Sequence, residues 1–204
     1  GVVVSKTIEE TNLENYFDIT LKVTSKDEIS SLAIPSSASI VLVIDNSGSM
    51  KRCMDGTYGN NNVCNDSSKV SRLDALKEAL NGAKRSNGTT DDTGFVDYFF
   101  KEAKDTFESL PVTADDNKIV RELGIVTFSS SASTVMPLTS YDKNSNFDVE
   151  KATVENYINR ISGNGATNPA TGLAAANKML ENSSNSSKYI IFLTDGLPTT
   201  TGNS

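Results

Sequence analysis

Apolar and polar residues alternate near the start of the chain in the manner of β-structure. Four apolar residues fall on one face of a single strand: Phe17, Ile19, Leu21 and Val23. The preceding stretch GVVVSKTI is similar in character, and Pro35 interrupts any regular element that follows. The pattern predicts an N-terminal β segment and linker, residues 1–36, followed by a larger domain over residues 37–204.

The larger segment alternates between apolar strands and amphipathic helices. Three runs are apolar on both faces, as in strands that helices cover on both sides: residues 39–45, 121–130 and 189–195. A run at residues 133–141 is expected to be an antiparallel neighbour at the sheet edge. Helical spacing of apolar residues recurs over residues 70–83, 97–110, 149–161 and 169–180. In the first of these helices the expected inward stripe is Val70, Leu73, Leu76, Ala79 and Leu80. The alternation predicts an α/β fold, a Rossmann-like, doubly wound and mostly parallel sheet flanked by helices.

The composition excludes several classes of function. The chain has 26 acidic and 19 basic residues, a net charge of -7, no His and two Cys. Without His it holds no Ser-His-Asp or Cys-His machinery and no imidazole zinc site, and two Cys are too few for a four-thiolate zinc site. An acidic chain without a basic stripe argues against nucleic acid as a partner. The longest apolar run, residues 40–44, is too short to span a membrane.

The two Cys bracket a polar loop that is rich in Gly and Asn. Cys53 and Cys64 are eleven positions apart, and this spacing suggests a local disulfide formed in an oxidising compartment. The alternative is a pair of unrelated reduced thiols. A disulfide would place the protein outside the cytosol.

Three polar clusters lie at or near the ends of the predicted core elements. They are DNSGS at residues 45–49, GATN at residues 165–168, and TDG at residues 194–196. In an open α/β sheet, functional groups gather beyond the carboxyl ends of the strands, so these clusters are expected to meet. They offer two carboxylates and several hydroxyls but no nitrogen or sulfur ligand. This hard-oxygen set suits Mg²⁺ or Mn²⁺ and is poor in anionic ligands for a tight Ca²⁺ site.

These clusters resemble the metal-ion-dependent adhesion site of von Willebrand factor A domains. DNSGS matches the D-x-S-x-S motif, Thr167 matches the loop Thr of the family, and Asp195 in LTDG matches its third-loop Asp. The resemblance covers about residues 39–200 and implies a metal site whose ligands are Asp45, Ser47, Ser49, Thr167 and Asp195. It implies Mg²⁺ as the ion, with Mn²⁺ or Ca²⁺ as alternatives. It also implies a non-enzymatic adhesion module that binds a Glu or Asp of a host matrix or cell-surface protein.

The residues leave two other functions open. The domain could be a structural stalk segment that the metal stiffens. It could also be a Mg²⁺-dependent phosphoryl-transfer enzyme with Asp45 as phosphate acceptor, although Ser47 stands where such enzymes carry a second Asp. Thr167, for its part, could serve only as the N-cap of the helix that starts near Pro169.

The N-terminal segment resembles the lead-in of Gram-positive surface and pilus-tip adhesins. That resemblance implies a position on the cell wall or a pilus, contact with other pilus or surface subunits, and an adjoining immunoglobulin-like domain to which residues 1–36 belong. It also raises an isopeptide bond at Lys6 with Asp18 as helper acid, against the alternative of an ordinary strand lysine. Because the family fold continues beyond its third loop, residues 37–204 are expected to be incomplete at the C-terminus and less soluble than a longer chain.

The loop between the two Cys is expected to lie at the rim of the metal site, because it leaves directly from Ser49. Tyr58 is the one large amphipathic side chain near its tip, and Tyr is favoured at binding hot spots. The sequence therefore makes Tyr58 a candidate for ligand selection.

Overall fold

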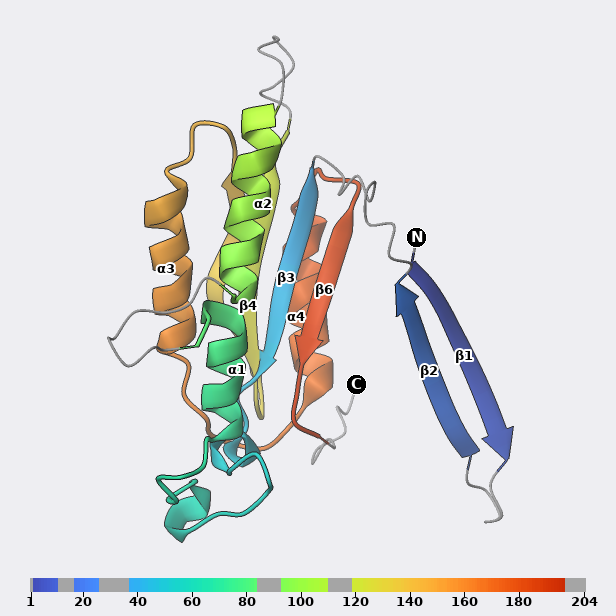
Figure 1. Ribbon diagram of the computed structural model, residues 1–204, viewed down its shortest axis with the longest axis vertical. Coiled ribbons are helices and arrows are strands. Elements are labelled where there is room, and N and C mark those ends of the chain that lie inside the picture. The colour runs from blue at the N-terminus through green and yellow to red at the C-terminus, as the bar shows by residue number, and fades with distance from the viewer. Residues whose placement is uncertain (1, 11–16, 26–36, 84–92, 110–118, 197–204) are drawn as a thin grey trace. The chain divides into compact units, whose positions relative to one another are not determined.

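The computed structural model describes residues 2–10, 17–25, 37–83, 93–109 and 119–196 (Figure 1). The chain forms two compact units, Gly1–Ile34 and Pro35–Ser204. The predicted division between residues 36 and 37 lies close to this boundary. The membership of the first unit in an immunoglobulin-like domain stays a prediction.

The first unit contains an antiparallel ribbon of β1 (Val2–Glu10) and β2 (Phe17–Ser25). Its register pairs Lys6 with Leu21 and Asp18 with Glu9. The isopeptide bond at Lys6, with Asp18 as helper acid, stays a prediction.

The second unit is built on a four-stranded sheet. Its strands are β3 (Ala38–Asp45), β4 (Arg121–Phe128), β5 (Ala132–Tyr141) and β6 (Lys188–Leu193). They lie in the order β5-β4-β3-β6, with β3 parallel to both β4 and β6. The strand β5 runs antiparallel to β4 at the edge of the sheet, which confirms the predicted edge strand.

Helices cover both faces of this sheet, so the predicted doubly wound α/β fold is confirmed. They are α1 (Arg72–Asn81), α2 (Phe95–Ser109), α3 (Phe147–Asn159) and α4 (Pro169–Glu181). The first three lie on one face and α4 lies on the other (Figure 1). None of the helices in the described ranges is both long and apolar enough to cross a membrane.

The central strand β3 is apolar on both faces because each face packs into a separate core. Leu42 and Ile44 join the core beneath α1, α2 and α3, whereas Val41 and Val43 join the core beneath α4. All four side chains are fully buried. This double burial holds the end of β3 in place, and with it the loop that follows Asp45.

The helix α1 begins two residues later than its apolar pattern predicts. Ser71 is the N-cap, and its hydroxyl accepts a hydrogen bond from the backbone N–H of Asp74 at 3.1 Å. Val70 therefore precedes the helix and is 43% exposed, and Ala79 also lies on the exposed side. The predicted stripe was wrong at these two positions, while Leu73 and Leu80 are buried as expected.

Candidate metal centre

Three loops meet at the carboxyl ends of β3 and β6. The first follows Asp45 and continues into the short 3-10 helix η1 (Gly48–Lys51). The second joins α3 to α4 and is tied to the first by two backbone hydrogen bonds. Gly48 N–H donates to the carbonyl of Gly165 at 2.9 Å, and Asn164 N–H donates to the carbonyl of Asn46 at 2.7 Å. The third loop follows β6, whose parallel pairing with β3 brings residues 194–196 to the same edge.

The side-chain oxygens of the first and third loops form two hydrogen-bonded groups. In the first group the hydroxyls of Ser47 and Ser49 are 3.0 Å apart, and Ser49 Oγ donates to Asp195 Oδ1 at 3.0 Å. In the second group Asp45 Oδ1 accepts from the N–H of Ser47 at 2.8 Å, and Asp45 Oδ2 accepts from Thr194 Oγ1 at 2.8 Å. The structure therefore brings together four of the five predicted ligands, from segments about 150 residues apart.

Thr167, the fifth predicted ligand, lies in the second loop and is buried, with 4% exposure. It lines a cleft of about 360 Å³ together with Ser49 and Gly165. Asn168 rather than Thr167 occupies the N-cap position of α4. Gly165 adopts a φ of +81°, a conformation that favours glycine, and this turn leads the loop into the cleft.

The donor set fits a hard divalent cation. Asp45 is fully buried, and within the described part of the chain its contacts are an N–H and a hydroxyl, with no cationic side chain in an ion pair. A buried carboxylate is costly unless a positive charge compensates it. Among the described residues no three His, Cys, Asp or Glu side chains are grouped so that they could hold a metal ion, and the candidate set has two carboxylates, Asp45 and Asp195. Together with hydroxyls, that chemistry suits Mg²⁺ or Mn²⁺.

Arg72 is a residue of this site that the sequence pattern missed. As the first residue of α1, it donates from Nη1 to Asp195 Oδ2 in an ion pair that joins segments 123 positions apart. The pattern gave Arg72 only a place on a helix, because no local motif marks a contact made at such separation. A cationic side chain among candidate metal ligands changes the charge of the site.

The loop between the two Cys is closed by a disulfide, which confirms the predicted pairing of Cys53 with Cys64 and rules out two reduced thiols. Both ends of the loop are anchored to the elements around the site. Cys53 pairs with Ser71 in an antiparallel bridge just before α1, and Cys64 N–H donates to the carbonyl of Lys51 in η1 at 2.8 Å. The disulfide therefore links η1 and the start of α1, two segments that flank the candidate ligands.

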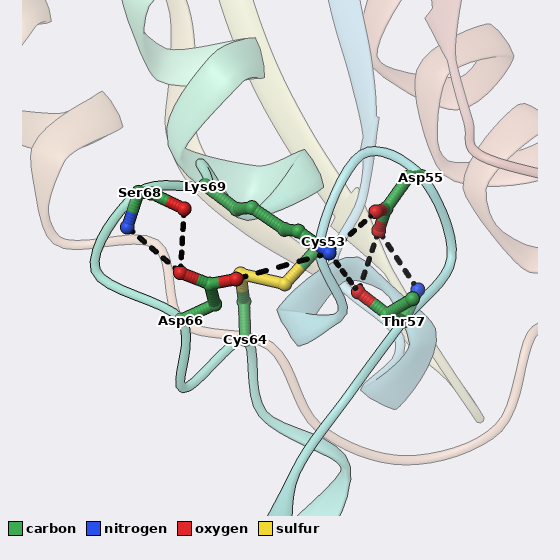
Figure 2. A network of polar contacts seen from close by, with 7 residues as sticks. All are labelled: Cys53, Asp55, Thr57, Cys64, Asp66, Ser68 and Lys69. Atoms are coloured by element: carbon green, nitrogen blue, oxygen red, sulfur yellow. Dashed lines mark hydrogen bonds and ion pairs between the residues drawn. A yellow bond between two sulfur atoms is a disulfide. The ribbon is translucent and has the colours of Figure 1, made fainter.

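Lys69 holds the same loop together from the outside (Figure 2). Its ammonium donates to Asp55 Oδ2 at 2.7 Å and to Thr57 Oγ1 at 3.1 Å, and it lies 3.8 Å from Asp66 Oδ2. Thr57 donates to Asp55 through both its hydroxyl and its N–H. The hydrogen bond from Lys69, followed by those from Thr57, lowers the pKa of Asp55 well below its ordinary value.

We expect Asp55 to stay ionised well below pH 3.8, its ordinary pKa. A carboxyl whose pKa is lowered on folding contributes stability above its unfolded pKa, and that contribution is lost as the pH falls through the folded pKa. The ion pair with Lys69 should therefore persist through the mildly acidic range. Carboxyl ¹³C NMR should find the Asp55 midpoint below 3.8, and Lys69→Met should move it upward. A wild-type midpoint at or above the ordinary value would show that the network does not form.

Tyr58 does not line the cleft, although the disulfide-closed loop reaches its rim. Asn61 and Asn62, in the short 3-10 helix η2 (Asn60–Asn62), line it instead. Tyr58 is 56% exposed and lies beneath the guanidinium of Arg52, 4.5 Å from the ring centroid. Arg52 itself lines the cleft, so Tyr58 contacts a residue of the cleft without lining it. The selection of ligands by Tyr58 stays a prediction.

Comparison with known proteins identifies the family. The family model of the von Willebrand factor type A domain matches residues 40–197. The vWF domain of the type V pili tip protein Mfa5 from Porphyromonas gingivalis aligns with 81% of this chain, at 18% identity and a TM-score of 0.50. The PilB minor pilin from Streptococcus sanguinis aligns with 96% of it, at 18% identity and a TM-score of 0.52.

At these identities the likeness to the two solved structures shows the fold alone, and the chain covers 40% and 46% of their respective lengths. A search of curated protein sequences gave no match. The family match spans more than half of the 204 residues and includes the three loops whose geometry is given above. The chain therefore belongs to the von Willebrand factor type A family.

Proposed function

We propose that this domain is a metal-ion-dependent adhesion module on a bacterial cell surface or pilus. A divalent cation, Mg²⁺ with Mn²⁺ or Ca²⁺ as alternatives, is held by oxygens of Asp45, Ser47, Ser49, Thr167 and Asp195. When bound, the cation supplies a positive charge with which a Glu or Asp carboxylate of an extracellular protein pairs. The observation that carries the proposal is the fully buried Asp45, at the meeting point of three loops, with no cationic partner among the described residues.

The surroundings of the site support an acidic ligand. Lys51 and Arg52 line the cleft beside Ser49 and Thr167, so the chain, although acidic overall, presents positive charge there. The Nε of Arg52 is buried and has no hydrogen-bond partner among the described residues. A carboxylate that reaches the cation would pass these cationic groups, and charge complementarity of this kind favours encounter and correct orientation.

A surface location is supported by the disulfide and by the related folds. Disulfides persist in oxidising compartments outside the cytosol, and the disulfide here closes the loop at the rim of the cleft. The two solved structures of similar fold are a pili tip protein and a minor pilin. Other pilus or surface subunits are accordingly proposed as partners beside the host protein. Because the two named organisms include both Gram-negative and Gram-positive bacteria, they leave the predicted Gram-positive origin as a prediction.

The test is binding of the chain to a panel of immobilised matrix proteins such as collagen and fibronectin, in Mg²⁺ and in EDTA. We expect binding to at least one of them that requires Mg²⁺ and is lost in Asp45→Asn. Tyr58→Ala should keep the Mg²⁺ requirement and change the order of preference, because it removes support from Arg52. Equal binding in Mg²⁺ and EDTA would refute the adhesion site. Thermal stabilisation by Mg²⁺ without any ligand binding would favour a structural stalk, and turnover of a phosphate ester would favour an enzyme.

A further inference from the structure

The ion pair between Arg72 and Asp195 places a permanent positive charge against one of the candidate metal ligands. Arg72 Nη1 donates to Asp195 Oδ2, while Ser49 Oγ donates to the other carboxylate oxygen, Oδ1. The Asp195 side chain is 9% exposed and the Arg72 side chain is 24% exposed. A pair so largely removed from water is screened by salt much less than a surface pair. Both oxygens of Asp195 are thus engaged by groups of the protein itself.

The backbone of Arg72 is anchored to the segment that leads into the disulfide-closed loop. Arg72 N–H donates to the carbonyl of Arg52 at 2.9 Å, and Met54 N–H donates to the carbonyl of Val70 at 3.0 Å. Gly56 lies so near the guanidinium that a Cβ at that position would be 3.5 Å from Nη2. These hydrogen bonds anchor the backbone at the start of α1 to the segment around Cys53. From this anchored position the guanidinium, whose side chain is 24% exposed, reaches Asp195.

The charge of the donor set follows directly. Asp45 and Asp195 contribute two negative charges, and Arg72 contributes one positive charge, so the net charge is -1 instead of -2. The affinity of an oxygen site for a divalent cation rises with the number of anionic ligands. A cationic group at contact distance from one carboxylate opposes a second cation in the same place. Arg72 should therefore weaken metal binding, and it should leave a bound cation with more uncompensated positive charge.

We propose that Arg72 is a resident counter-cation that sets the metal affinity of this site. It restrains Asp195 from acting as a full anionic ligand, so that the bound cation keeps charge for the carboxylate of a ligand. Arg72 is thus a positioning residue for Asp195 and not a metal ligand. This role rests on the proposed function, because it assumes that the five oxygens hold a cation.

The test is calorimetric titration of the full chain with MnCl₂ and with MgCl₂ alone, so that no ligand has to be known. Arg72→Gln should bind both ions about tenfold more tightly than wild type, because one nearby positive charge is removed. Lys178→Gln removes the same charge from an exposed position on α4 and should stay within about twofold of wild type. Unchanged or weaker metal binding in Arg72→Gln, while wild type binds metal, would overturn the role of Arg72. Absence of metal binding in wild type and all variants would instead overturn the proposed function.

If Arg72→Gln fails to fold, an NMR measurement on the wild-type protein tests the role of Arg72. The Nε–Hε NMR signal of Arg72, assigned by its loss in Arg72→Lys, should shift when MgCl₂ is added. The same signal should stay in place in Asp45→Asn, which lacks half of the carboxylate charge of the site. A wild-type signal that does not move while the metal binds would show that the Arg72 guanidinium and the metal ion do not compete for Asp195.

Discussion

Asp45→Asn is expected to abolish metal binding while leaving the fold intact. The substitution keeps the size of the side chain and removes one of the two carboxylate charges at the centre of the three loops. Because Asp45 is fully buried and lacks a cationic partner among the described residues, the lost charge is the one that the cation would compensate. Calorimetric titration with MnCl₂ should show binding in wild type and none in the variant.

Asp148→Asn provides the matched control for this variant. Asp148 is exposed in the first turn of α3, at the opposite end of this helix from the loop that carries Thr167. Asp148→Asn removes one negative charge, as Asp45→Asn does. Its metal affinity should equal that of wild type. Circular dichroism should confirm that both variants are folded. Equal Mn²⁺ affinity in wild type and Asp45→Asn would refute the assignment of Asp45 to the metal site.

Removal of the disulfide by Cys53→Ser together with Cys64→Ser is expected to lower the free energy of unfolding by about 2–3 kcal/mol. The cross-link closes a loop of sequence separation 11 and mainly restricts the unfolded chain. Cys53 is also buried, with 1% exposure, so a hydroxyl at that position adds a desolvation cost. Urea denaturation monitored by circular dichroism measures the loss.

Single substitutions and chemical reduction separate the two contributions. Cys64→Ser breaks the same cross-link and changes only the half-buried Cys64. Its free energy of unfolding should therefore be close to that of wild type under reducing conditions. The double variant should be the least stable because it also alters buried Cys53. If wild type unfolds at the same urea concentration with and without reductant, the cross-link contributes nothing to stability.

The strands and the candidate ligands were predictable because their signals are local. A strand such as β3, buried on both faces, requires a continuous apolar run, and the run ends where Asp45 reaches the edge of the sheet. Asp45 and Asp195 lie at or just beyond such ends, and the parallel pairing of β3 with β6 brings those ends together. The pairing of the two Cys was predictable because the chain has no third one.

The features that the sequence did not predict depend on contacts between distant segments or on a competing local interaction. Arg72 meets Asp195 only because the fold brings the start of α1 to the loop that follows β6, and no spacing in the sequence encodes that meeting. Val70 fits the apolar period of α1, but the Ser71 hydroxyl caps the helix and leaves Val70 outside it. Tyr58 was predicted to meet the ligand because of its size and polarity. In the structure the Tyr58 ring instead packs against the Arg52 guanidinium, a contact that residue size and polarity do not predict.

The most direct test of the metal site is a crystal structure of the chain grown in MnCl₂, with anomalous scattering recorded near the manganese absorption edge. We expect one strong anomalous peak among the oxygens of Asp45, Ser47, Ser49, Thr167 and Asp195. An additional acidic group or water should complete its coordination. Well-ordered loops with no anomalous peak there, or a peak only at surface carboxylates elsewhere, would contradict the metal-dependent adhesion site.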